Sequence, residues 1–208
     1  MRNNKSIPFE TVVEFHGHAC PGLALGYRVA QAAMQRLRSD RSDDEEFVAV
    51  VENDACGVDA VQFVCGCTFG KGNLVFRDYG KQAFTFYNRE TGEGMRLYAE
   101  PVYMDYPDDP EFVALRQNAN RTADEDDRLN QLMERRIQRI LSMPEDDFLS
   151  IGEPQGPMPT KARIFSSGRC SACGERAMES RLTPAGDRVY CRPCAAGKQC
   201  GHLSCPQD

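Results

Sequence analysis

The chain has 208 residues, a formal net charge of −6 and ten cysteines. Its length fits one ordinary domain plus a small appendage, and its acidic balance gives no overall attraction to nucleic acid or an anionic membrane. The sequence has no run of 18 apolar residues and no signal peptide, so we expect a cytoplasmic protein without a membrane span. In that compartment, clustered cysteines indicate metal ligands or catalytic thiols rather than a disulfide framework.

Hydrophobic spacing predicts an α+β core followed by a linker. Helical spacing is found over 8–15, 21–37, 58–64, 109–118 and 124–141, and strand-like segments over 47–52, 74–79, 83–88 and 95–99. We expect the last three strands to form an antiparallel meander added to strand 47–52. The stretch 144–168 is rich in Pro, Gly and Ser, which predicts a linker. The expected organisation is therefore a core domain over 1–150, a linker over 151–168 and a small domain over 169–208.

Two of the three histidines and one cysteine meet within five residues, as His16, His18 and Cys20. Imidazole and thiolate groups bind borderline-soft metals and also perform nucleophilic and acid–base chemistry. If 16–20 is extended, the three side chains point the same way. Pro21 suits a first helical turn, so Cys20 would lie at a helix N-terminus with a lowered pKa. The alternative is a Gly-rich turn with an inert buried cysteine and two surface histidines.

Cys56 repeats this arrangement, because it follows the strand 47–52 and precedes the helix 58–64. It is therefore a second candidate thiolate, with Glu52 and Asp54 as possible hydrogen-bond acceptors or ligands. The alternative is a strand-to-helix turn that carries an incidental cysteine.

The loop that follows, 65–73, contains Cys65, Cys67 and Lys71 between glycines. It departs from a Walker A loop, because the first spacer is one residue short and Gly72 replaces the hydroxyl residue that binds Mg²⁺. We expect Lys71 to place a cation near a thiolate or an anionic substrate.

The last third of the chain carries the spacing Cys170-x2-Cys173-x17-Cys191-x2-Cys194. This pattern is typical of a four-cysteine structural zinc site, and the predicted order of knuckle, hairpin and helix start matches a treble clef or zinc ribbon. Redox dithiols are the alternative. A second metal at Cys200, His202 and Cys205 competes with incidental thiols in a terminal tail. The six arginines between 163 and 192 leave nucleic-acid binding open.

The motifs together resemble the FmdE-like proteins, a family named for the FmdE subunit of formylmethanofuran dehydrogenase. The resemblance rests on FHGHACPGLALGYR at 15–28, ENDACGVDAVQ at 52–62 and GCTFGKGNLVFRDYGKQAFTFYNRETGEG at 66–94. It implies a thioredoxin-like α+β core with a mixed five-stranded sheet flanked by helices, often dimeric, and in some members a C-terminal treble-clef zinc finger.

The resemblance also implies a core metal site. Its implied ligands are His16, His18, Cys20 and Cys56, with Cys67 as an alternate ligand or redox thiol. Cys65 departs from the family pattern. The implied partners are a second copy of the chain and a molybdenum or tungsten enzyme subunit or a pterin-dependent system. The FmdE subunit is not itself the molybdenum or tungsten catalytic subunit.

The leading hypothesis is a metal-binding accessory protein linked to one-carbon or molybdoenzyme metabolism, including methanogenesis. It would hold one structural Zn²⁺ in the tail and a second Zn²⁺ or other transition metal in the core. If the chain is an enzyme, Cys20 would be the nucleophile or ligand, His18 the base and Lys71 the anion anchor. The rival is a zinc-finger regulatory or binding module whose core dimerises. A thioredoxin-type redox role is third, because Cys20 lacks a Cys-x-x-Cys partner.

Overall fold

The computed structural model describes residues 7–100 and 109–197. The chain divides into two compact units, Met1–Ala162 and Arg163–Asp208, and this boundary falls inside the segment predicted as a linker. In the described part of the chain, no helix combines the length and the apolar character that a bilayer span requires. The possible tail ligands Cys200, His202 and Cys205 lie outside the described residues.

The first unit is built on one mixed sheet of five strands in the order β2-β1-β3-β4-β5. The strands are β1 Phe47–Val51, β2 Leu74–Phe76, β3 Ala83–Asn88, β4 Gly94–Ala99 and β5 Leu149–Gly152. Strand β2 pairs parallel to β1, and the other pairs are antiparallel. The predicted mixed five-stranded sheet is confirmed. The predicted meander is wrong for β2, which lies on the opposite side of β1 from β3.

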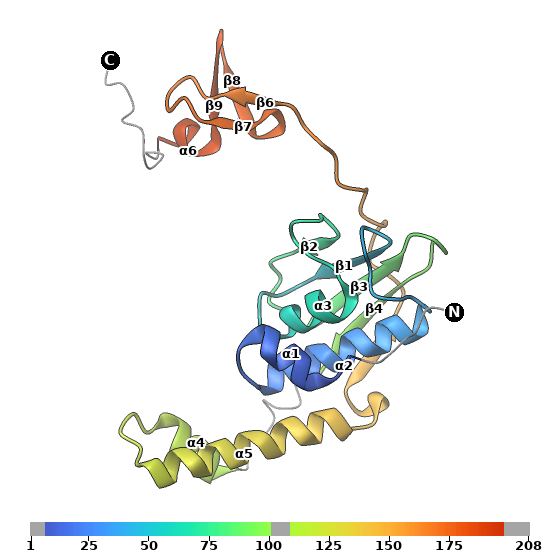
Figure 1. Cartoon of the computed structure of the whole chain (residues 1–208), viewed down its shortest axis with the longest axis vertical. Helices are drawn as coiled ribbons and strands as arrows, with labels where there is room; N and C mark the ends of the chain where they lie inside the picture. Colours follow the sequence, from blue (N-terminus) through green and yellow to red (C-terminus); the bar gives the residue numbers. More distant parts are fainter. Residues whose placement is uncertain (1–6, 101–108, 198–208) are drawn as a thin grey trace. The chain divides into compact units, whose positions relative to one another are not determined.

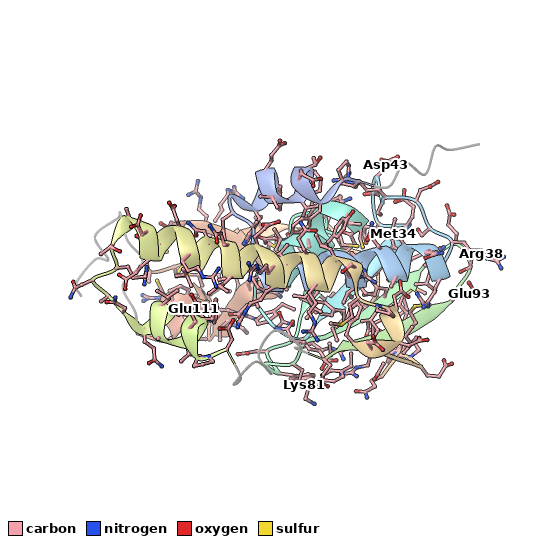
Figure 2. The ribbon with its side chains drawn as sticks, turned by 90° about the horizontal axis from the view of Figure 1, so that it is seen from below. Met34, Arg38, Asp43, Lys81, Glu93 and Glu111 are labelled. Carbon is pink, nitrogen blue, oxygen red and sulfur yellow. The ribbon has the colours of Figure 1, made fainter. Side chains whose placement is uncertain are left out.

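Helices pack on the sheet and on one another. They are α1 Phe9–His16, α2 Pro21–Arg36, α3 Gly57–Cys65, α4 Pro110–Gln117 and α5 Ala123–Ser142, with a 3₁₀ turn at Glu145–Asp147. Figure 1 shows α2 between the sheet and α5. Figure 2 shows α5 lying lengthwise along α2, with Glu111 of the neighbouring α4 near one end of α5 and Arg38, which follows α2, beyond the other. All five predicted helices are therefore confirmed in position.

The two faces of the sheet bury different residues, because side chains alternate along a strand. Along β1, Phe47, Ala49 and Val51 join the core under the helices. Val48 and Val50 face the other way and pack with Tyr87 and Met158. The Tyr87 hydroxyl donates a hydrogen bond to the Gly156 carbonyl at 2.9 Å, so the chain after β5 covers part of this second face.

The described part of the second unit contains two short hairpins, a 3₁₀ turn and one turn of α-helix. Its elements are β6 Ser167–Arg169, β7 Arg176–Met178, a 3₁₀ turn at Glu179–Arg181, β8 Leu182–Ala185, β9 Arg188–Cys191 and α6 Arg192–Ala195. Strand β6 pairs with β7, and β8 pairs with β9. The buried centre of this unit is formed by Cys170, Cys173 and Cys191, so cysteines replace the usual apolar side chains.

Candidate metal centres

The segment 16–20 turns sharply between two helices. Helix α1 ends at His16, and Gly17 adopts φ 95° as its C-cap, with its N–H donating to the Val13 carbonyl at 2.7 Å. A left-handed backbone of this kind favours glycine. Cys20 is extended and is the N-cap of α2, as the sequence predicts. The extended arrangement considered for 16–20 does not hold for the whole segment, because His16 belongs to α1.

The four predicted core ligands nevertheless meet. One ligand atom from each of His16, His18, Cys20 and Cys56 lies within 4.8 Å of all the others. Cys56 reaches this position because it is the N-cap of α3, whose first turn touches α2. A Cβ atom added at Gly26 would lie 2.2 Å from the Gly57 carbonyl oxygen. The absence of side chains at Gly26 and Gly57 therefore lets the two helices approach closely.

His16 is oriented by a carboxylate. Its Nδ1 lies 2.7 Å from Oδ2 of Asp59 in the first turn of α3. Its Nε2 is buried and has no hydrogen-bond partner among the described residues. A histidine that donates Nδ1–H to a carboxylate presents a basic Nε2 lone pair, which is the usual arrangement of a metal ligand. The unpaired Nε2 therefore fits a cation within the cluster.

Sequence reasoning missed Asp59 and considered Glu52 and Asp54 instead. Glu52 is buried and forms a bidentate pair with Arg96, with both N–O distances 3.0 Å. Asp54 is exposed. The sequence did show that Asp59 is an acidic residue three positions after the candidate thiolate Cys56. It did not show that Asp59 contacts His16, because that contact depends on the packing of α1 on α3.

The Cys20 thiol is less acidic than its helix position predicts. Burial raises its pKa to about 11, against a lowering contribution from the Leu23 N–H, which donates to Sγ at 3.3 Å. The neighbouring Cys56 thiol contributes to this rise. The lowered pKa predicted for Cys20 at this helix N-terminus is therefore wrong. A bound cation is what would favour the thiolate form of Cys20 at neutral pH.

Two other predicted site residues lie apart from this cluster. The Cys67 thiol is fully buried and donates to the Phe47 carbonyl at 3.3 Å. Burial raises its pKa to about 12. Lys71 Nζ donates to the carbonyls of Ser42 and Asp43 at 2.9 and 3.3 Å. Lys71 therefore links its own loop to the loop that contains Ser42 and Asp43, and it is not part of the cluster.

The second cluster contains the four predicted tail cysteines. The Sγ atoms of Cys170, Cys173, Cys191 and Cys194 all lie within 4.8 Å of one another. Cys170 and Cys173 follow β6, Cys191 ends β9, and Cys194 lies in α6. Burial opposes ionisation of Cys170, but N–H groups that include those of Cys173 and Cys191 lower its pKa to about 6. These N–H groups therefore stabilise negative charge on the Cys170 sulfur. For Cys173, the Glu175 N–H lowers the pKa, but desolvation and the neighbouring Cys170 and Cys191 thiols raise it to about 12.

Both donor sets fit a borderline-soft metal. Two imidazoles with two thiolates, or four thiolates, form the tetrahedral shells that Zn²⁺ takes in proteins. The tail cluster is almost entirely buried, whereas in the core cluster His18 is exposed and the other three residues are partly buried. The tail set is therefore more shielded from solvent than the core set, in which His18 is exposed.

A family model and a curated relative each match most of the chain. The family model described as "FmdE, Molybdenum formylmethanofuran dehydrogenase operon" matches residues 15–150. A "Probable S-adenosyl-L-methionine-binding protein" of Archaeoglobus fulgidus is 35% identical over 177 residues, which cover 81% of this chain. The chain spans about half of that relative, 48% of its length.

A solved structure shares the fold. It is a tungsten formylmethanofuran dehydrogenase FmdE-like protein from Syntrophus aciditrophicus, with a TM-score of 0.61 and 24% identity. The match covers 97% of this chain and 98% of that one. The family match spans more than half of the chain and contains all four residues of the core cluster. The chain therefore belongs to the FmdE family.

Proposed function

We propose that the core unit binds one zinc or similar transition-metal ion through His16, His18, Cys20 and Cys56. Two observations carry the proposal: one ligand atom from each of the four residues lies within 4.8 Å of the others, and the buried Nε2 of His16 has no hydrogen-bond partner among the described residues. An unpaired buried nitrogen is costly, and a cation offsets that cost. The fit of the donor set to zinc supports zinc over a hard cation such as Mg²⁺, which prefers oxygen ligands.

The tail cluster would hold a structural Zn²⁺ in a treble-clef arrangement. Knuckle, hairpin and short helix carry Cys170, Cys173, Cys191 and Cys194 in that order. A unit this small, with cysteines at its buried centre, has too little apolar core to fold without a metal. The metal would therefore serve stability in the tail.

The biological role we propose is that of a cytoplasmic metal-binding accessory protein. Membership of a family named for the formylmethanofuran dehydrogenase operon supports a link to one-carbon or molybdoenzyme metabolism. In this proposal the core is thioredoxin-like, the chain forms a homodimer, and a molybdenum or tungsten enzyme subunit or a pterin-dependent system is its partner. With Cys20 and His18 as metal ligands, neither is free to act as nucleophile or base while the ion is held.

Metal content measured on the full chain tests the proposal. We expect two zinc ions per chain and one in Cys56→Ala, because that variant lacks one core ligand. Cys67→Ala is the matched control, since its buried thiol lies outside both clusters, and it should keep two ions. One zinc per chain in both the natural protein and Cys56→Ala would contradict the core site.

A second candidate function is binding of nucleic acid or an acidic protein through the tail. Residues 163–197 carry six arginines against three acidic residues, although the whole chain has a net charge of −6. Such a local excess of positive charge attracts polyanions. In a gel-shift assay, charge reversal at Arg176 and Arg188 should abolish binding if this function exists. Binding that is unchanged in this variant, or absent from the natural protein, would contradict it.

A further inference from the structure

The four ligands of the core cluster are held to very different degrees. Asp59 fixes the ring of His16, whose side chain is 11% exposed. The Leu23 N–H holds the Cys20 sulfur, and Cys56 is placed by the start of α3. His18 differs from these three. It lies on the exposed bend after Gly17, and its side chain makes no hydrogen bond or ion pair with any described residue. Its ring lies against the His16 ring, with centroids 4.5 Å apart.

Two aromatic residues, Phe15 and Phe63, lie on the same two helices that carry His16 and Asp59. The rings of Phe15 and Phe63 lie 5.1 Å apart. Phe15 directly precedes His16 on α1, and Phe63 lies one helical turn after Asp59 on α3. Phe15 remains 52% exposed. Arg41 Nε donates a hydrogen bond to the Phe63 carbonyl at 2.9 Å, which helps to fix the C-terminal end of α3. The His16–Asp59 contact and the Phe15–Phe63 contact are thus successive contacts along the α1–α3 interface.

We propose that His18 is the exchangeable ligand of the core metal and that the position it leaves takes a small ligand with an aromatic body. The inference rests on the proposed core metal site and assigns that site its ligand class. Three anchored ligands retain the ion, which leaves one coordination position open when His18 moves away; open positions distinguish reactive metal sites from structural ones. The incoming ligand offers a nitrogen, oxygen or sulfur donor to the ion and packs its ring against Phe15 and Phe63.

Co²⁺ spectroscopy of the full chain tests His18. The spectrum of Cys56→Ala reports the tail site alone, so subtraction from the natural protein isolates the core ion. We expect His18→Ala to retain core Co²⁺. The core Co²⁺ affinity of His18→Ala should be at least tenfold higher than that of His16→Ala. Added imidazole should then fill the vacant position and restore a spectrum close to that of the natural protein, while leaving Cys56→Ala unchanged.

The same variant tests the role of Phe15 and Phe63 with a matched pair of probes. In His18→Ala, 4-phenylimidazole should bind about tenfold more tightly than imidazole, because the added ring buries apolar area and stacks on Phe15. That ratio should fall toward one when Phe15→Ala is added. The control is Phe76→Ala in the same background, since Phe76 is an exposed aromatic residue of β2, and the ratio should persist.

The outcomes separate this inference from the proposed function. If His18→Ala loses core Co²⁺ as completely as His16→Ala, or if 4-phenylimidazole binds no more tightly than imidazole, the inference is overturned while the metal site stands. If the natural protein and Cys56→Ala give identical Co²⁺ spectra, both the metal site and the inference fail.

Discussion

The Asp59 carboxylate orients the His16 ring through its 2.7 Å contact with Nδ1. Removing such a partner of a metal-bound histidine costs about 10- to 100-fold in metal affinity. We therefore expect Asp59→Asn to weaken core zinc binding by about that factor, measured by competition with a chromogenic chelator. Asp54→Asn is the control, because Asp54 is exposed and its side chain makes no hydrogen bond with the described residues. Equal affinities in the two variants would contradict the role of Asp59.

Residue type and position made His16, His18, Cys20 and Cys56 candidate ligands or thiolates, and the family resemblance joined them in one proposed site. Neither revealed the groups that support them. His16, His18 and Cys20 are close in sequence, and Cys56 shares with Cys20 a position at a helix start. Asp59 depends on how α1 packs on α3. Cys67 and Lys71 depend on the path of a loop held by Asn73, whose amide donates to the Phe47 carbonyl at 2.9 Å. Contacts between distant segments carry no local sequence signal.

The contact between the N-terminal half of α2 and the start of α3 is the element-scale feature on which the core site depends. A Cβ at Gly26 would lie 2.2 to 2.6 Å from backbone atoms of Gly57. Because these are backbone atoms, relieving the clash requires a shift of a whole helix rather than a change of side-chain rotamer. Gly26→Ala gains about 1 kcal/mol of helix propensity but incurs a larger packing cost. We expect a net loss of about 2 kcal/mol or more in urea unfolding, with reduced core metal content.

Gly70→Ala is the matched control for this change. A Cβ there meets no atom within 4 Å and its φ lies outside the left-handed region, so unfolding free energy should change by less than about 0.5 kcal/mol. If Gly26→Ala is equally neutral, the close approach of the two helices does not position the site.

Element positions followed hydrophobic periodicity closely, whereas strand pairing did not. The long helix predicted over 124–141 is Ala123–Ser142, and its start is fixed by a capping box at Thr122 and Glu125. The residue pattern of 74–79 could not show that β2 pairs parallel to β1, because the sequence of a single strand does not encode the direction of its partner. Strand β5 was missed because four residues, LSIG, lie within a stretch rich in Pro and Gly.

The two units of the molecule are stabilised by different means. The first contains a continuous apolar core under α1, α2 and α3, whereas the buried centre of the second consists of Cys170, Cys173 and Cys191. Removal of metal by a strong chelator should therefore unfold the second unit and spare the sheet of the first. Hydrogen exchange should show loss of amide protection in β6 to β9 and retention in β1 and β3. Simultaneous loss in both units, or retention in both, would contradict this difference.

At the scale of the whole chain, the central claim is that two metal ions have two different ligand sets. X-ray absorption at the zinc edge measures those ligands directly in the full chain. Sites with four sulfurs and with two sulfurs and two nitrogens predict an average of three sulfurs and one nitrogen per zinc. Cys56→Ala should shift the average toward four sulfurs as the core ion is lost. A single zinc bound only by sulfur in the natural protein would contradict the account.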